Sequence, residues 1–154
     1  MAAEIITVCE AIKTWIADGL DAPGDATVSR VYIAPVDVDT ITTRQVFVFP
    51  LAYNNGPSTR GENEWIYSIQ VSCVEKYTAV GNPTNDWIDA RVDFVQDKIF
   101  DRCGFDRQLL TFGTTRELVT QSQETVSVYD EALLSQQKLF RSDVVFEFRE
   151  TLTA

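Results

Sequence analysis

The sequence predicts a single α+β domain, residues 1–154, with two main helices packed on a mostly antiparallel or mixed β-sheet. Between residues 65 and 73 every second residue is apolar, which is the period of a strand with one buried face. Ile88, Val92, Val95 and Ile99 recur at spacings of three and four, the period of an amphipathic helix. A chain of 154 residues is long enough to enclose a sizeable core.

The first third of the chain contains one predicted helix and two predicted strands. Apolar residues on one face predict a helix over Glu4–Asp18, and Gly19 is a plausible stop. A short strand is expected over Arg30–Ala34, before Pro35. A second strand is expected over Gln45–Tyr53. Its centre is apolar on both faces, which favours a central position in the sheet, covered on both sides.

Residues 54–63 contain two glycines, a proline and charges, so an exposed flexible loop is expected there, joining two strands of a hairpin. The strand that follows runs over Glu64–Glu75. Gly81, Asn82 and Pro83 interrupt the chain, Asn85 is the predicted N-cap of the second helix, and Gly104 ends that helix.

The last third gives weaker signals. A short strand is expected over Leu109–Phe112, and Glu117–Tyr129 alternates imperfectly around a polar middle that favours a bulge or loop. Residues 130–137 fit either a helical turn or a loop, and 121–137 is the second predicted flexible region. Val144–Arg149 predicts a last strand, with alternate residues apolar. Consecutive strands with short connections favour the α+β class.

The chain is strongly acidic, with a formal net charge of −10. Such a surface repels phosphate, which excludes nucleic-acid binding through a basic patch. No apolar run approaches the roughly 20 residues of a membrane span, so no membrane partner is expected. The N-terminal residues lack the basic region of a signal peptide, which predicts folding in a cytoplasm.

A row of aspartates is the most unusual feature of the second helix. Its members recur every three or four residues and are Asp86, Asp89, Asp93, Asp97 and Asp101. Like charges at this spacing cost about 0.2–0.5 kcal/mol per pair in helix stability. The row has two interpretations, a solvated face that maintains solubility or a functional acidic surface.

The residue types predict no catalytic, cofactor-binding or metal site, and no enzyme. The chain has no histidine, which excludes the Ser-His-Asp and Cys-His forms of nucleophile activation and histidine-ligated zinc. Cys9, Cys73 and Cys103 each lie in an apolar pattern, typical of buried, reduced thiols. Carboxylates four residues apart on a helix form at best a weak cation site.

One arrangement of motifs resembles a known family. It comprises Val46-Phe47-Val48-Phe49-Pro50, a loop with Ser58-Thr59-Arg60-Gly61, the strand Glu64–Glu75 followed by Lys76, and a helix with Ile-Asp-x-x-Val-Asp-x-Val over Ile88–Val95. This arrangement resembles the tail-terminator or tail-completion proteins of long-tailed bacteriophages. The N-terminal helix and Arg30-Val31-Tyr32 before Pro35 are similar too. The resemblance covers roughly the first two thirds of the chain, and 117–137 departs from it.

The resemblance implies a structural virion protein of the tail-neck region, assembled in the host cytoplasm. It would form a homo-hexameric ring that caps the tail tube and meets the head connector or stopper protein, while DNA passes through the lumen. Two alternatives remain, a head-completion or stopper neck protein and an acidic inhibitor that mimics nucleic acid.

In the ring interpretation, the aspartate row or the acidic loops would line the lumen. Arg60, with Ser58 and Glu62 in the same loop, is the candidate contact with a subunit or with the tube; a plain solvated loop is the alternative. The strand edges at Gln45–Tyr53 and Val144–Arg149 are candidates for extending the sheet between subunits.

Overall fold

The computed structural model describes residues 4–33, 41, 43–59, 62–104, 109–112 and 116–153. These residues form one mixed sheet of six strands in the order β1-β2-β3-β6-β5-β4, in which only the β1–β2 pair is parallel. The predicted α+β class is therefore confirmed. In chain order the elements are α1 (Glu4–Asp18), β1 (Thr27–Arg30), β2 (Gln45–Thr59), β3 (Glu62–Lys76), α2 (Asn85–Phe94), the π-helix η2 (Val95–Phe100), α3 (Asp101–Gly104), β4 (Leu109–Phe112), β5 (Arg116–Ser127), α4 (Glu131–Gln137) and β6 (Leu139–Thr153).

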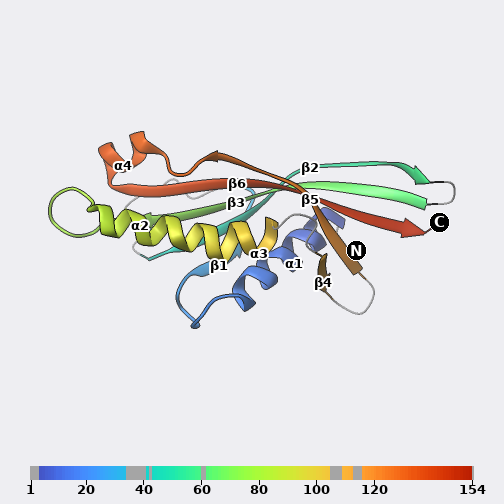
Figure 1. Cartoon of the computed structure of the whole chain (residues 1–154), viewed down its shortest axis with the longest axis horizontal. Helices are drawn as coiled ribbons and strands as arrows, with labels where there is room; N and C mark the ends of the chain where they lie inside the picture. The colour runs from blue at the N-terminus through green and yellow to red at the C-terminus, as the bar shows by residue number, and fades with distance from the viewer. Residues whose placement is uncertain are drawn as a thin grey trace.

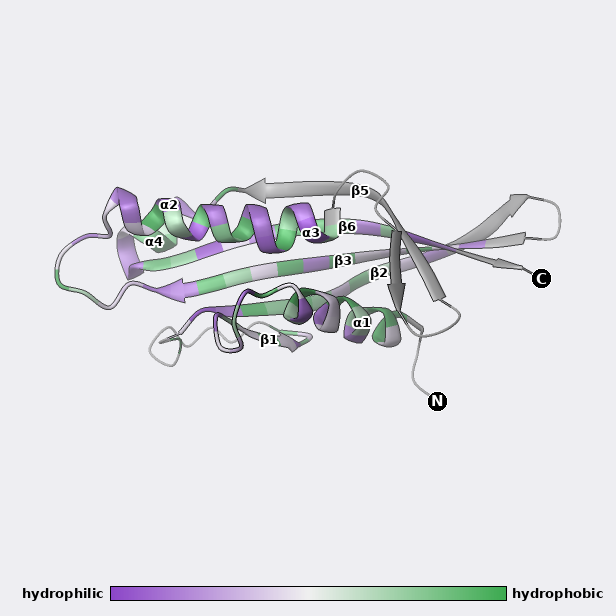
Figure 2. Ribbon diagram, turned by 60° about the horizontal axis from the view of Figure 1, so that its bottom comes forward, coloured by the Kyte–Doolittle hydropathy of each residue, from purple (hydrophilic) through white to green (hydrophobic). Residues whose placement is uncertain are grey.

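The main core lies between one face of the sheet and the helices. On β3 this face consists of the alternating residues Tyr67, Ile69, Val71 and Cys73, all fully buried. Register brings Val48 of β2 and Val144 of β6 to either side of Val71. Helix α1 and the continuous helix α2-η2-α3 lie side by side on this face (Figure 1). Residues of both helices belong to the main core, and hydrophobic and hydrophilic residues alternate along α2 (Figure 2).

The two helices are joined by a reciprocal contact between Trp15 and Arg102. Arg102 Nε donates to the Trp15 carbonyl oxygen at 2.7 Å, and Trp15 Nε1 donates to the Arg102 carbonyl oxygen at 3.2 Å. The guanidinium also lies 4.5 Å from the centre of the indole ring. The Arg102 side chain passes so close to Gly19 that a Cβ there would lie 2.1 Å from Arg102 Nε. Glycine at the end of α1 thus makes room for the contact.

The opposite face of the sheet carries a smaller apolar cluster. Phe47 and Phe49 of β2 lie in it, together with Ile41, Val74 and Leu139, and Leu133 of α4 packs against it. The prediction that the centre of β2 is buried on both faces is therefore confirmed, since Val46 and Val48 lie in the main core.

Several strand boundaries differ from the sequence prediction. β1 occupies Thr27–Arg30, earlier than the predicted Arg30–Ala34. Most of the expected loop 54–63 is strand instead, because β2 continues to Thr59 and pairs along its length with β3. In the expected flexible region 121–137, residues 121–127 belong to β5, which has the predicted irregular register, and Glu131–Gln137 forms α4.

The second helix begins and bends differently from the prediction. Thr84, and not Asn85, is the N-cap, because the Thr84 hydroxyl accepts from the Trp87 backbone N–H at 3.2 Å. Over Val95–Phe100 the helix widens into a π-turn, in which the Asp101 N–H donates to the Gln96 carbonyl oxygen five residues earlier. The predicted row of aspartates therefore does not follow one regular α-helical stripe to its end.

The cap assignment predicts different effects for two neighbouring alanine substitutions. Thr84→Ala should lower the free energy of unfolding by about 1 kcal/mol, because it removes the acceptor for an N-terminal N–H group. Asn85→Ala should change it by less than about 0.5 kcal/mol, since alanine favours a helix interior more than asparagine does. Urea denaturation of both variants measures the difference. A larger loss for Asn85→Ala would contradict the assignment.

Candidate functional site

The outer edge of β2 is the longest strand edge left without a neighbour among the described residues. β1 pairs only with Gln45–Val48, and β3 occupies the other side of β2 throughout. Four large hydrophobic side chains are exposed along this edge and at the end of β1. We call them the β2-edge patch; they are Tyr32, Ile33, Leu51 and Tyr53, with exposed fractions of 63, 81, 51 and 62%. Large exposed apolar side chains gathered in one place mark interaction surfaces.

The β2-edge patch is continuous with the N-terminal half of α1. Ile5 and Ile6 line a shallow groove together with Pro50 and three residues of the patch. Tyr53 packs against Trp65 on β3, with ring centres 5.8 Å apart. At the other end of the patch the Arg30 guanidinium lies 5.3 Å from the centre of the Tyr32 ring.

Arg30 and Lys13 make the surroundings of the β2-edge patch locally cationic. Arg30 Nε lies 2.7 Å from Glu10 Oε1, and Lys13 Nζ lies 3.3 Å from Glu10 Oε2. The hydrogen bond from Arg30 is the main reason why the pKa of Glu10 is lowered. Two cations thus share one carboxylate beside the patch, in a protein that is acidic overall.

The predicted aspartate row lies on the long helix, mostly in solvent. Asp86, Asp89 and Asp93 of α2 are exposed, and the Asp97 side chain is 70% exposed. Lys98 Nζ lies 3.2 Å from Asp97 and 2.8 Å from Asp21, so part of the row's charge is paired. Asp101 is less exposed, because it follows the π-turn and faces a pocket beside the helix.

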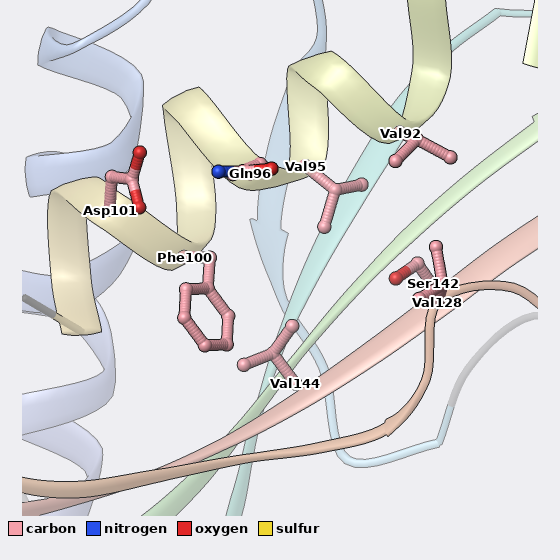
Figure 3. Close-up of a pocket in the computed structure, with 8 residues that line it drawn as sticks. All are labelled: Val92, Val95, Gln96, Phe100, Asp101, Val128, Ser142 and Val144. Atoms are coloured by element: carbon pink, nitrogen blue, oxygen red, sulfur yellow. The ribbon is translucent and has the colours of Figure 1, made fainter. Parts of the chain in front are cut away.

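This pocket has a volume of about 230 Å³ and lies between the long helix and β6. We call it the β6 pocket; it is lined by Val92, Val95, Gln96, Phe100, Asp101, Val128, Ser142 and Val144 (Figure 3). Gln96 and Phe100 belong to the π-turn, which forms one wall. Val128, just after β5, is 55% exposed and marks the mouth. The lining is mainly apolar, so the pocket is suited to an apolar or aromatic group.

Two of the three predicted contact residues of the 54–63 segment, Ser58 and Glu62, lie near the described ends of the β2–β3 hairpin. Ser58 is in β2, and Glu62 begins β3 opposite Thr59. Arg60 lies outside the described residues, so its role stays a prediction. Figure 1 shows the far ends of β2, β3 and β6 extending together past both helices.

The two predicted docking edges have different outcomes. The prediction of a docking edge at Val144–Arg149 is wrong, because β6 lies inside the sheet between β3 and β5. The Gln45–Tyr53 edge is free only beyond Val48. The β2-edge patch was not predicted from the sequence, although Leu51 and Tyr53 continue the apolar character of the strand beyond Pro50. The β6 pocket was not predicted either, because one of its walls depends on the π-turn.

The three cysteines are buried, as predicted, and none of them forms a disulfide. Burial raises the pKa of Cys9, Cys73 and Cys103 from 9.0 to about 12. A thiol of this kind stays protonated at neutral pH and is a poor nucleophile and metal ligand. Within the described residues no group of three or more His, Cys, Asp or Glu side chains is placed to hold a metal ion. The helices described here are all too short or too polar to cross a membrane.

Comparisons with known proteins give one structural likeness to report. No family model matches the chain, and no curated protein matches it. Among solved structures it is similar to a sheath/tube terminator, in the extended state, of the extracellular contractile injection system PVC, with 15% identity and a TM-score of 0.37. The match covers 96% of this chain, which spans 57% of that protein's chain. A likeness at this level of identity and TM-score does not indicate a function.

The buried thiols predict a loss of stability in alkali. Between pH 9 and 12 the unfolded chain releases thiol protons that the folded chain retains, so the free energy of unfolding falls as pH rises. Each thiol lowers the free energy of unfolding by up to about 1.4 kcal/mol per pH unit in this range. Cys103→Ala should make this slope shallower by about that amount, measured by urea denaturation at a series of pH values. An unchanged slope would contradict the burial of an ionisable thiol at this position.

Proposed function

We propose that this chain is a structural subunit that joins copies of itself into a ring at the end of a phage tail tube, as a tail terminator, and that it is not an enzyme. The β2-edge patch is the observation that carries the proposal. A free strand edge with four exposed hydrophobic side chains is an assembly surface, and its exposure in an isolated subunit favours coverage by another protein. The resemblance of the 46–95 motifs to tail-terminator proteins favours a ring at the end of a tail tube as the kind of assembly.

The acidic charge fits a ring through which DNA passes. A lumen that bound phosphate through lysine and arginine would retain DNA, because each contact releases counterions. The exposed aspartates of α2 give the chain a surface that repels phosphate. In this proposal the ring has six subunits, caps the tube, contacts the head connector or stopper protein, and resides in the tail-neck region of the virion after assembly in the host cytoplasm. A head-completion or stopper protein would share these properties.

The exposed aspartates also favour a second candidate, an acidic inhibitor that mimics nucleic acid. Asp86, Asp89 and Asp93 present carboxylates in a line on one helix. Such an inhibitor would bind a basic partner in a salt-sensitive manner and would not need to self-associate. The oligomeric state therefore separates the two candidates.

Native mass spectrometry over a range of protein and salt concentrations tests the ring. The expected result is a closed six-subunit species that becomes more abundant with protein concentration. Leu51→Glu should reduce it at least ten-fold, because it places a charge in the β2-edge patch. Val80→Glu is the matched control, since Val80 is fully exposed and lies outside the patch; it should leave the species unchanged. A strict monomer at every concentration would favour the inhibitor.

A second experiment tests whether the aspartate row faces the DNA path. Asp89→Lys combined with Asp93→Lys should convert the ring from one that releases duplex DNA at about 0.15 M salt to one that retains it. Asp18→Lys combined with Glu131→Lys changes the net charge equally at exposed positions on other helices and is the control. Fluorescence anisotropy of labelled duplex DNA measures binding. Equal retention by both variants would place the row outside the lumen.

A further inference from the structure

The β6 pocket contains a buried polar atom that lacks a partner among the described residues. Ser142 is 1% exposed, and within the described part of the chain its Oγ has no hydrogen-bond partner. In Figure 3 Ser142 and Val144 on β6 face Val92, Val95 and Phe100 across the pocket, with Val128 close to Ser142. A buried hydroxyl that lacks a partner costs free energy, and it gains most from an occupant that supplies one. A group with both an apolar body and a polar end would therefore be the best fit to the pocket.

The size and lining of the β6 pocket fit one tyrosine side chain. Its volume is about 230 Å³, and an apolar cavity of about 150 Å³ is large enough for benzene. A phenol adds a hydroxyl that can pair with Ser142 Oγ while the ring contacts the valines and Phe100. Aromatic side chains that fill pockets of this kind dominate the affinity of protein interfaces.

The same chain offers such a side chain on its other edge. Tyr53 is 62% exposed in the β2-edge patch and is held by Trp65 on a paired strand. Tyr32 is equally exposed, but the Arg30 guanidinium covers one face of its ring at 5.3 Å, so that face is not available to contact the pocket walls. Tyr53 is therefore the better candidate.

The charges around the two surfaces are complementary. Arg30 and Lys13 lie beside the β2-edge patch, whereas Asp101 lines the β6 pocket. The patch is on the β2 side of the sheet, and the pocket is on the β6 side, beyond β3. Surfaces that are complementary and lie on different sides of one subunit form head-to-tail contacts, which produce rings when the rotation closes.

We propose that Tyr53 of one copy inserts into the β6 pocket of the next copy and that its hydroxyl pairs with Ser142 Oγ. This contact rests on the proposed function in that it takes the chain to self-associate. Each copy gives one tyrosine and receives one, so the interface repeats in one direction around the assembly.

Directed disulfide formation tests the contact even where association is weak. Leu51→Cys places a thiol in the same groove as Tyr53, and Gln96→Cys places one on the pocket wall; both positions are exposed. The native cysteines are buried and do not compete. A mixture of the two variants under mild oxidation should give a cross-linked heterodimer in at least ten-fold excess over the control mixture of Thr78→Cys with Gln96→Cys. Equal yields in both mixtures would overturn the proposal.

Two further substitutions test the role of the tyrosine and its hydroxyl. Adding Tyr53→Ala to the Leu51→Cys chain should abolish the excess yield, because the inserted ring is lost. Tyr53→Phe should weaken self-association about two- to ten-fold when Ser142 is present. In a chain that already carries Ser142→Ala, Tyr53→Phe should weaken self-association no further. Independent effects of Tyr53→Phe and Ser142→Ala would contradict the hydrogen bond between the two side chains.

The disulfide experiment and native mass spectrometry together test the Tyr53 contact and the six-subunit ring separately. A selective disulfide without a closed six-subunit species would support the contact and contradict the ring. A closed ring without the selective disulfide would support the proposed function and overturn this contact.

Discussion

The two-residue alternation of β3 is the constraint on which the rest of the fold depends. β3 pairs with β6 over its whole length and with β2 from Glu62 to Val74, so its register sets which residues of both neighbours face the helices. A slip of one residue would turn Tyr67, Ile69 and Val71 away from the core and expose them. Both helices bury their apolar faces against this one surface, and the Trp15–Arg102 contact then fixes them side by side. The positions of the β2-edge patch and the β6 pocket follow from the same register.

Local periodicity was enough to predict much of this fold. The bounds of α1 and β4, the extent of the second helix and the buried face of β3 all depend on patterns within about 20 residues. Segments whose structure depends on distant partners were predicted poorly. Asn54, Asn55, Gly56 and Pro57 favour a turn by themselves, yet β3 pairs with them and extends the hairpin. The insertion of β6 between β3 and β5 is equally non-local, which is why the Val144–Arg149 edge was misjudged.

The candidate surfaces were harder to predict than the fold, for a related reason. The aspartate row was visible because a helix makes its spacing regular, but the π-turn ends that regularity and directs Asp101 to a pocket. A π-turn has no dependable sequence signal, so neither the pocket nor the isolation of Ser142 Oγ was expected. The β2-edge patch joins residues of β2 with residues of the segment after β1, and the parallel pairing of β1 with β2 brings them together.

The charge distribution favours a head-to-tail contact over other modes of association. Copies with a net charge of −10 repel one another, so a productive encounter has to bring the few cationic regions near carboxylates. A symmetric contact between two β2-edge patches would instead oppose the cations Arg30 and Lys13 to their own counterparts. Continuous sheet formation along β2 is also hindered, since Pro50 and Pro57 provide no N–H group for a new neighbour. The free edge is thus better suited to recognition through its side chains than through backbone hydrogen bonds, and the β6 pocket, with its apolar lining and Asp101, meets both the apolar and the electrostatic requirement.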